Sequence, residues 1–202
     1  KADQIPNDAI KESKYLYITS LSNEAAQELT KLTQVAKECN VPIALNPGKS
    51  QLTSGALFLK NALSMIDIII MNKTEAELFM KTLMNQDQEL KDSLRCENNM
   101  QQCSPLIDQR LPYLLEDTIT LDDHEFSLKL FFQKLLDWGP RIIVVTHGCN
   151  GVYVATKSRC YFHPSKPVTL VSSVGAGDAF GSAFVGALLK KYPIERAIRF
   201  GI

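Results

Sequence analysis

Short apolar runs with strand character alternate with helical segments along most of the chain, and this alternation limits the possible folds more than any other feature. In the helical segments, apolar residues recur every three or four positions, whereas several of the short runs are apolar without interruption. Strands that are apolar on both faces are typical of a parallel sheet covered by helices on both sides. The sequence therefore predicts an α/β protein, a three-layer αβα sandwich of the Rossmann-like kind with a mostly parallel sheet.

The expected elements follow one another in a simple order. Parallel strands are expected at residues 15–19, 41–45, 67–71 and 141–146, and helices at residues 23–39, 54–65, 125–138 and 176–190, with a further helix opened by Pro193. Two later runs, residues 152–155 and 159–163, alternate polar and apolar positions around a Lys157-Ser158 turn. This pattern predicts a late antiparallel hairpin.

One stretch interrupts the alternation. Residues 81–123 are rich in Gln, Asn, Asp and Glu and show little periodicity. A chain of 202 residues is long enough for one sizeable core, and the length prior favours one domain over two. We therefore predict a single domain over residues 1–202, with residues 81–123 as an insertion within it.

Composition excludes several classes of partner. The chain has 22 basic and 22 acidic residues, so no global field recruits nucleic acid or an anionic membrane surface. Its longest apolar runs are far too short to span a bilayer. Its five cysteines show no CxxC spacing, which indicates reduced thiols rather than a disulfide framework or a zinc site. We expect a cytoplasmic protein that binds neither nucleic acid nor membrane.

The strongest chemical signal is the run Val174-Gly175-Ala176-Gly177-Asp178 at the start of an Ala-rich helix. Glycines at a loop-to-helix junction let several backbone N–H groups point at one spot, and the helix dipole adds positive potential there. The pattern predicts an anion site. For Asp178 the spacing leaves two interpretations open, a helix cap and a general base that accepts a proton from an attacking hydroxyl.

Two common glycine motifs do not fit. A dinucleotide-binding G-x-G-x-x-G would need glycine where Phe180 stands, and it should follow the first strand of a βαβ unit. The tripeptide Gly48-Lys49-Ser50 mimics the end of a phosphate-binding P-loop, but the leading glycine of that motif would fall on Ile43. Neither motif is present.

The run V-G-A-G-D-A-F, with Gly181 beyond it, resembles the second signature of the ribokinase-type (PfkB-type) carbohydrate kinases. The resemblance implies a ribokinase-like sandwich. It also implies that the amides of Gly175, Ala176 and Gly177 hold the transferred phosphate and that Asp178 is the catalytic base.

Two further stretches agree with this family in order and kind. Asn72-Lys73-Thr74-Glu75 resembles its N-x-x-E motif, which implies that Asn72 helps to bind the phosphates and that Glu75 binds Mg²⁺ through water. The stretch Thr146 to Gly151 resembles its T-x-G-x-x-G nucleotide loop, which implies that Thr146, Gly148 and Gly151 line the triphosphate. Taken alone, each stretch also has a structural interpretation, as a helix cap or a turn.

The resemblance implies an enzyme that uses Mg²⁺ and ATP to phosphorylate a hydroxyl group of a sugar or nucleoside. The alternative is a non-catalytic nucleotide-binding or interaction module derived from the same fold. Ser172 and Ser173 stand where the family signature has Asp and Thr, so we expect little activation by a monovalent cation. The family's N-terminal strands and lid have no counterpart here, which would expose apolar residues 15–19 and favour a homo-oligomer.

Overall fold

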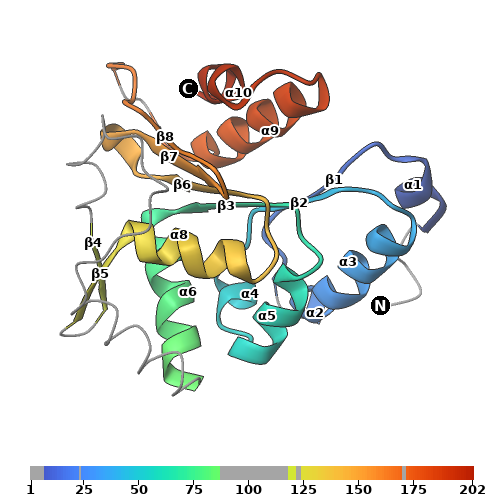
Figure 1. Ribbon diagram of the computed structural model, residues 1–202. Coiled ribbons are helices and arrows are strands. Elements are labelled where there is room, and N and C mark those ends of the chain that lie inside the picture. The colour runs from blue at the N-terminus through green and yellow to red at the C-terminus, as the bar shows by residue number, and fades with distance from the viewer. Residues whose placement is uncertain (1–6, 23, 87–117, 122–123, 170–171) are drawn as a thin grey trace.

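The computed structural model describes residues 7–22, 24–86, 118–121, 124–169 and 172–202. Its main sheet has six strands in the order β1-β2-β3-β6-β7-β8 (Figure 1). The first four are parallel and the last two antiparallel. Their bounds are β1 Leu16–Ile18, β2 Ile43–Leu45, β3 Ile68–Asn72, β6 Ile142–Thr146, β7 Val152–Thr156 and β8 Cys160–His163. The mostly parallel sheet and the late hairpin are confirmed.

Strand pairing brings distant parts of the sequence to one edge of this sheet. Asn72 at the end of β3 pairs with Thr146 at the end of β6, and Thr146 pairs in turn with Val152 at the start of β7. Val152 pairs with His163 at the end of β8. We call this side, where the parallel strands end, the carboxyl edge. It holds the loops that follow β3 and β6.

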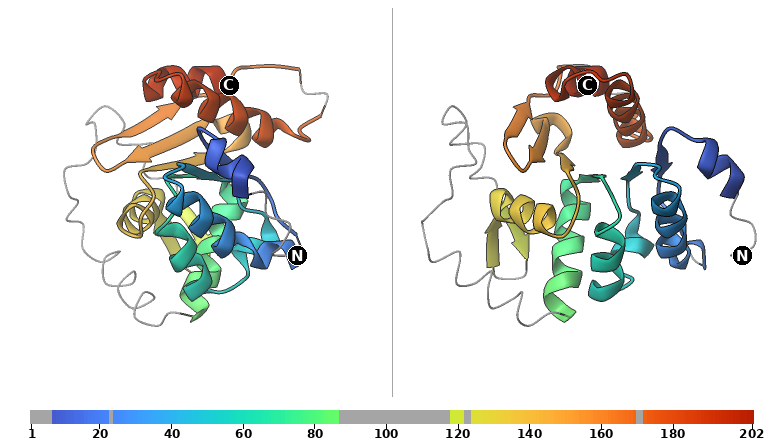
Figure 2. Two further views of the ribbon diagram at one scale, coloured as in Figure 1. Left: turned by 90° about the vertical axis from the view of Figure 1, so that its right-hand side faces the viewer. Right: turned by 45° about the vertical axis from the view of Figure 1, so that its right-hand side comes forward.

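Helices cover both faces of the sheet, so the chain has the three predicted layers. Figures 1 and 2 show α9 and α10 on one face and α3, α4, α5, α6 and α8 on the other, in each of the three views. The bounds are α1 Asn7–Glu12, α2 Glu24–Gln27, α3 Leu29–Glu38, α4 Lys49–Leu52, α5 Ala56–Leu63, α6 Lys73–Gln86, α8 Leu128–Asp137, α9 Ala176–Leu189 and α10 Ile194–Gly201.

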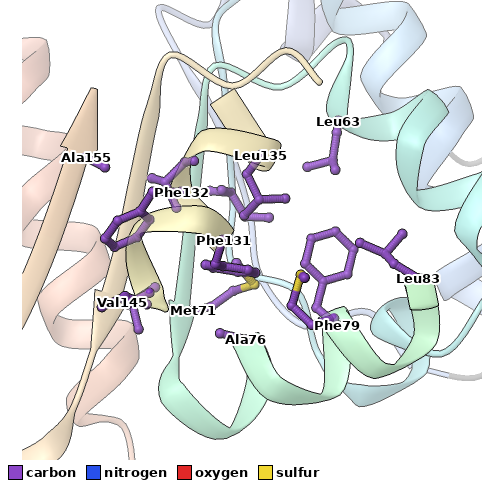
Figure 3. Packing of buried hydrophobic residues seen from close by; sticks show 14 of the residues in the cluster. Leu63, Met71, Ala76, Phe79, Leu83, Phe131, Phe132, Leu135, Val145 and Ala155 are labelled. Atoms are coloured by element: carbon purple, nitrogen blue, oxygen red, sulfur yellow. The ribbon is translucent and has the colours of Figure 1, made fainter. Parts of the chain in front are cut away.

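Each face has its own aromatic core. Between the sheet and helices α6 and α8, the rings of Phe79 and Phe131 meet edge to face with centroids 6.5 Å apart (Figure 3). On the opposite face, the rings of Phe180 and Phe184 of α9 stack on each other with centroids 5.7 Å apart. Both rings pack with the apolar side chains of β3 and β6. Burial of these rings fixes α6, α8 and α9 on the sheet and therefore fixes the loops at the carboxyl edge.

The structure adds detail at two predicted segments. The insertion at residues 81–123 stays a prediction; within this range α6 continues to Gln86, and Thr118–Leu121 forms strand β4. Residues 87–117 and 122–123 lie outside the described residues. The helix predicted at 125–138 begins only at Leu128, because His124–Ser127 forms strand β5 and pairs antiparallel with β4. The short helices α1 and α4 were not predicted.

Candidate active site

Three of the predicted motifs lie at the carboxyl edge or close to it. The β3–α6 junction carries Asn72 and Glu75, and the loop after β6 follows Thr146, which is the pairing partner of Asn72. The first turn of α9 carries Asp178, whose negative charge raises the pKa of Glu75. This coupling places the two carboxylates within electrostatic reach of each other, although they are about a hundred residues apart in sequence.

Asn72 and Glu75 form a reciprocal cap at the start of α6. The backbone N–H of Asn72 donates to Glu75 Oε2 at 2.9 Å, and the backbone N–H of Glu75 donates to Asn72 Oδ1 at 2.8 Å. This is a capping box, so the structural interpretation of the N-x-x-E stretch holds. The cap uses the Oε2 atom of the Glu75 carboxylate.

The carboxyl group of Glu75 is half-buried, and its pKa is raised. Burial is the largest cause, the hydrogen bonds with Asn72 oppose it, and the charge of Asp178 adds to the rise. Two acidic side chains within electrostatic reach of each other form a site of excess negative charge. Such a site favours a bound cation.

The loop after β6 is a tight turn closed by backbone hydrogen bonds. Gly148–Asn150 forms a 3-10 turn, and the N–H of His147 donates to the carbonyl of Gly151 at 2.8 Å. Gly148 and Gly151 both have positive φ, 51° and 116°. A β-carbon at Gly151 would overlap the carbonyl oxygen of His163, so packing requires that glycine. Gly148 is exposed, with open space where a β-carbon would be.

The start of α9 presents backbone N–H groups that the helix does not use. Gly175 precedes the helix with φ 79°, a left-handed conformation that suits glycine. The N–H of Ala176 donates to the carbonyl of Ser173 at 3.2 Å. The N–H groups of Gly175, Gly177 and Asp178 have no acceptor within the part of the chain that the structure describes. These free donors, rather than that of Ala176, are available to an anion.

No packing contact explains Gly177. It lies in the first turn of α9 without a positive φ, and a β-carbon there would have no other atom within 4 Å. Alanine at this position would stabilise the helix by about 1 kcal/mol relative to glycine. The absence of a side chain leaves open space at this turn, as an anion-binding turn needs.

Tyr17 is a residue near this site that sequence reasoning missed. It lies on β1, and its phenol ring packs against α9 at Gly181, where a β-carbon would overlap the Tyr17 hydroxyl oxygen. Burial, reinforced by the charge of Asp178, raises the pKa of Tyr17 to about 12. A tyrosine within a short apolar strand carries no motif signal, so only the packing of α9 against β1 shows it.

A cavity of about 620 Å³ lies at the opposite edge of the sheet, where the parallel strands begin. Tyr15, Asp67, Arg141 and Lys157 are among its lining residues, and none of them belongs to a predicted motif. The predicted site residues and this cavity therefore lie at opposite ends of the strands.

Within the described ranges, no group of three or more His, Cys, Asp or Glu side chains is arranged to hold a metal ion. Glu75 and Asp178 form a pair, which leaves further ligands to water or to a bound phosphate. None of the described helices is both long and apolar enough to cross a membrane.

Comparisons with known proteins agree with this geometry. Residues 117–202 match the model of the pfkB family carbohydrate kinases. The ribokinase of Haemophilus influenzae is 27% identical over 168 residues, which cover 83% of this chain and 41% of that protein. The crystal structure of ribokinase from Thermotoga maritima superposes with a TM-score of 0.67 at 19% identity, over 100% of this chain and 52% of that one. The structure of a ribokinase II from E. coli in complex with ATP and Mg²⁺ superposes with a TM-score of 0.67 at 16% identity. The match covers 100% of this chain and 54% of that one.

The sheet order, the covering helices and these matches define a ribokinase-like fold. Residues 117–202 match the pfkB carbohydrate kinase model, and the chain as a whole is similar to ribokinases in sequence and in fold. It spans about half the length of the structures it matches and 41% of the Haemophilus influenzae relative.

Proposed function

We propose that this chain forms the nucleotide-binding and catalytic part of an ATP-dependent kinase that phosphorylates a hydroxyl group of a sugar or nucleoside. The observation that carries the proposal is the first turn of α9, where free N–H groups, an open Gly177 and an exposed carboxylate, Asp178, lie together. A phosphoryl transfer needs positioning and charge neutralisation more than covalent assistance. This turn supplies donors for the phosphate and a base for the hydroxyl.

In this proposal, Asp178 accepts the proton of the attacking hydroxyl group, and the N–H groups of Gly175 and Gly177 donate to the oxygens of the transferred phosphoryl group. Ala176 keeps the turn in place through its bond to Ser173. Thr146, Gly148 and Gly151 line the rest of the triphosphate. The open Gly148 leaves room for a ligand, whereas Gly151 maintains the shape of the loop.

The donor set fits Mg²⁺. Glu75 offers a half-buried carboxylate, and the like charge of Asp178 nearby makes a divalent cation favourable there. Asn72 and Glu75 would hold the hydrated ion, and the ion would neutralise charge on the phosphates. The reciprocal cap at the start of α6 keeps both side chains in a fixed position when no ion is bound.

Little potassium activation is expected. Ser172 has a neutral hydroxyl group that accepts the backbone N–H of Val174 at 3.2 Å, so this side chain shapes the loop before α9. Hard cations prefer charged or carbonyl oxygens as ligands.

The rival function is a nucleotide-binding or interaction module without catalysis. A direct test uses the full-length natural protein with Mg²⁺, ATP and a panel of sugars and nucleosides, and identifies phosphorylated product by mass spectrometry. We expect one class of acceptor to be phosphorylated. ATP binding without any phosphorylated acceptor would favour the rival function.

A further inference from the structure

We propose that Tyr17 is a positioning residue of this site, whose hydroxyl group donates a hydrogen bond to the carboxylate of Asp178 when ligand occupies the site. This inference rests on the proposed function, because it concerns the group assigned as the base. It adds a residue from β1, a strand on which no motif falls.

The Tyr17 hydroxyl group is buried and unpaired. Its oxygen is inaccessible to solvent, and among the described residues nothing hydrogen-bonds to it. Leaving such a group unpaired costs free energy comparable to a lost hydrogen bond, and phenylalanine at this position would avoid that cost. A tyrosine kept here without a partner indicates that a partner arrives in another state of the protein.

The surrounding helix makes room for this hydroxyl group. Gly181 is buried in α9, and a β-carbon on it would overlap the Tyr17 hydroxyl oxygen and lie 3.0 Å from Cζ. Glycine is the poorest helix former apart from proline. One contact between β1 and α9 therefore combines two destabilising features. These are a glycine inside a helix and an unpaired phenol hydroxyl group.

Asp178 is the acceptor that geometry favours. It lies three residues before Gly181, and residues at this spacing are neighbours on one side of a helix. In the ligand-free structure Asp178 is exposed, so water satisfies its carboxylate. A bound nucleotide and acceptor would exclude that water, and the carboxylate would then need a protein donor.

The phenol is suited to be a donor rather than a competing base. Burial and the charge of Asp178 raise its pKa to about 12, so the hydroxyl group keeps its proton at neutral pH. A phenol that donates to a carboxylate forms a charge-assisted hydrogen bond, which fixes the orientation of the acceptor. The bond would hold Asp178 toward the reacting hydroxyl group without itself taking part in the transfer.

The first test compares Tyr17→Phe with Tyr15→Phe in the full-length protein. Tyr15 is a matched control because it lies two residues earlier on the same side of the sheet, at the edge away from Asp178. For Tyr17→Phe we expect kcat to fall by about 10- to 10²-fold with the KM for ATP within about twofold of the parent. The melting temperature should stay the same or rise, since the substitution removes an unpaired polar group.

Two results of this comparison would overturn the inference. One is a kcat for Tyr17→Phe no lower than that of Tyr15→Phe. The other is a loss of kcat accompanied by a lower melting temperature, which would show that the hydroxyl group matters for folding.

A second test does not depend on activity. The chain has six tyrosines, so ¹³Cζ labelling gives a simple spectrum in which Tyr17→Phe identifies the Tyr17 resonance. On addition of Mg²⁺ and a non-hydrolysable ATP analogue, this resonance should shift in the parent and not in Asp178→Ala, which has no side-chain acceptor. An equal shift in both proteins would refute the pairing. A parent that phosphorylates nothing would refute the proposed function alone, because the resonance comparison still decides the pairing.

Discussion

At the scale of single residues, Asp178 has two possible roles that one substitution separates. As an exposed acidic residue in the first turn of α9, it stabilises the helix through the dipole whether or not it is a base. Asp178→Asn keeps the shape of the side chain and removes the proton acceptor. We expect ATP binding to change little and kcat to fall by about 10² to 10⁴-fold, measured by calorimetry and by steady-state turnover.

If the turnover of Asp178→Asn were within a few-fold of the parent, Asp178 would not be the base. Its role would then be to stabilise the helix. The melting temperature is the control, because loss of a favourable helix-end charge should lower it by only a small amount.

Glu75 likewise combines a structural contact with a proposed ligand role. Glutamine can still accept the backbone N–H of Asn72, so Glu75→Gln should preserve the cap at the start of α6. A neutral amide binds hydrated Mg²⁺ less strongly than a carboxylate does. We therefore expect an unchanged melting temperature and a higher Mg²⁺ concentration for half-maximal activity. An unchanged Mg²⁺ titration would assign Glu75 to the cap alone.

The cysteines provide a chemical probe of the nucleotide loop. Cys149 is exposed within the turn after β6, whereas burial raises the pKa of Cys160 to about 11. Because the thiolate is the reactive form, an alkylating reagent at pH 8 should modify Cys149 much faster than Cys160. Mg²⁺ and ATP should slow the modification of Cys149, as followed by peptide mass spectrometry. Equal rates with and without nucleotide would argue against ATP binding at this loop.

At the scale of elements, α9 contains a matched pair of glycines. A β-carbon would meet no other atom within 4 Å at Gly177, in the first turn, or at Gly186, in the third. Alanine at either position should raise the melting temperature, because glycine inside a helix costs about 1 kcal/mol. Only Gly177→Ala should lower activity, by roughly 10²-fold, because its methyl group displaces the phosphate. Equal activity in the two variants would contradict an anion site at this turn.

The sequence predicted the main strands well because their apolar runs are buried on both faces. The β6 strand, for example, was expected at 141–146 and is found at Ile142–Thr146. The start of α8 was predicted three residues early. Glu125 and Phe126 are compatible with either structure, and pairing with β4 makes them a strand. Pairing between separate segments is a long-range effect that local propensity does not contain.

The candidate site was predictable where a motif follows a strand. Asn72 and Thr146 end neighbouring parallel strands, so the sequence order and the sheet topology together bring them to one edge. Which N–H groups at the start of α9 are free was not predictable, because the bond from Ala176 to Ser173 depends on the conformation of the loop. The contact of Tyr17 with Gly181 was not predictable either, because it depends on how α9 packs against β1.

At the scale of the whole molecule, the sheet has two ends with different character. The carboxyl edge carries free N–H groups and two acidic side chains, whereas the cavity at the other edge includes Arg141 and Lys157. Both ends offer groups that can attract an anion. We assign ATP to the carboxyl edge because the open glycines and the acidic pair are found there, together with the loop after β6.

A crystal structure of the full-length protein with Mg²⁺ and a non-hydrolysable ATP analogue tests this assignment most directly. We expect the terminal phosphate at the N–H groups of Gly175 and Gly177, with Asp178 facing it and Mg²⁺ on the side of Glu75. A triphosphate bound in the cavity beside Arg141 and Lys157, with the first turn of α9 unoccupied, would contradict it.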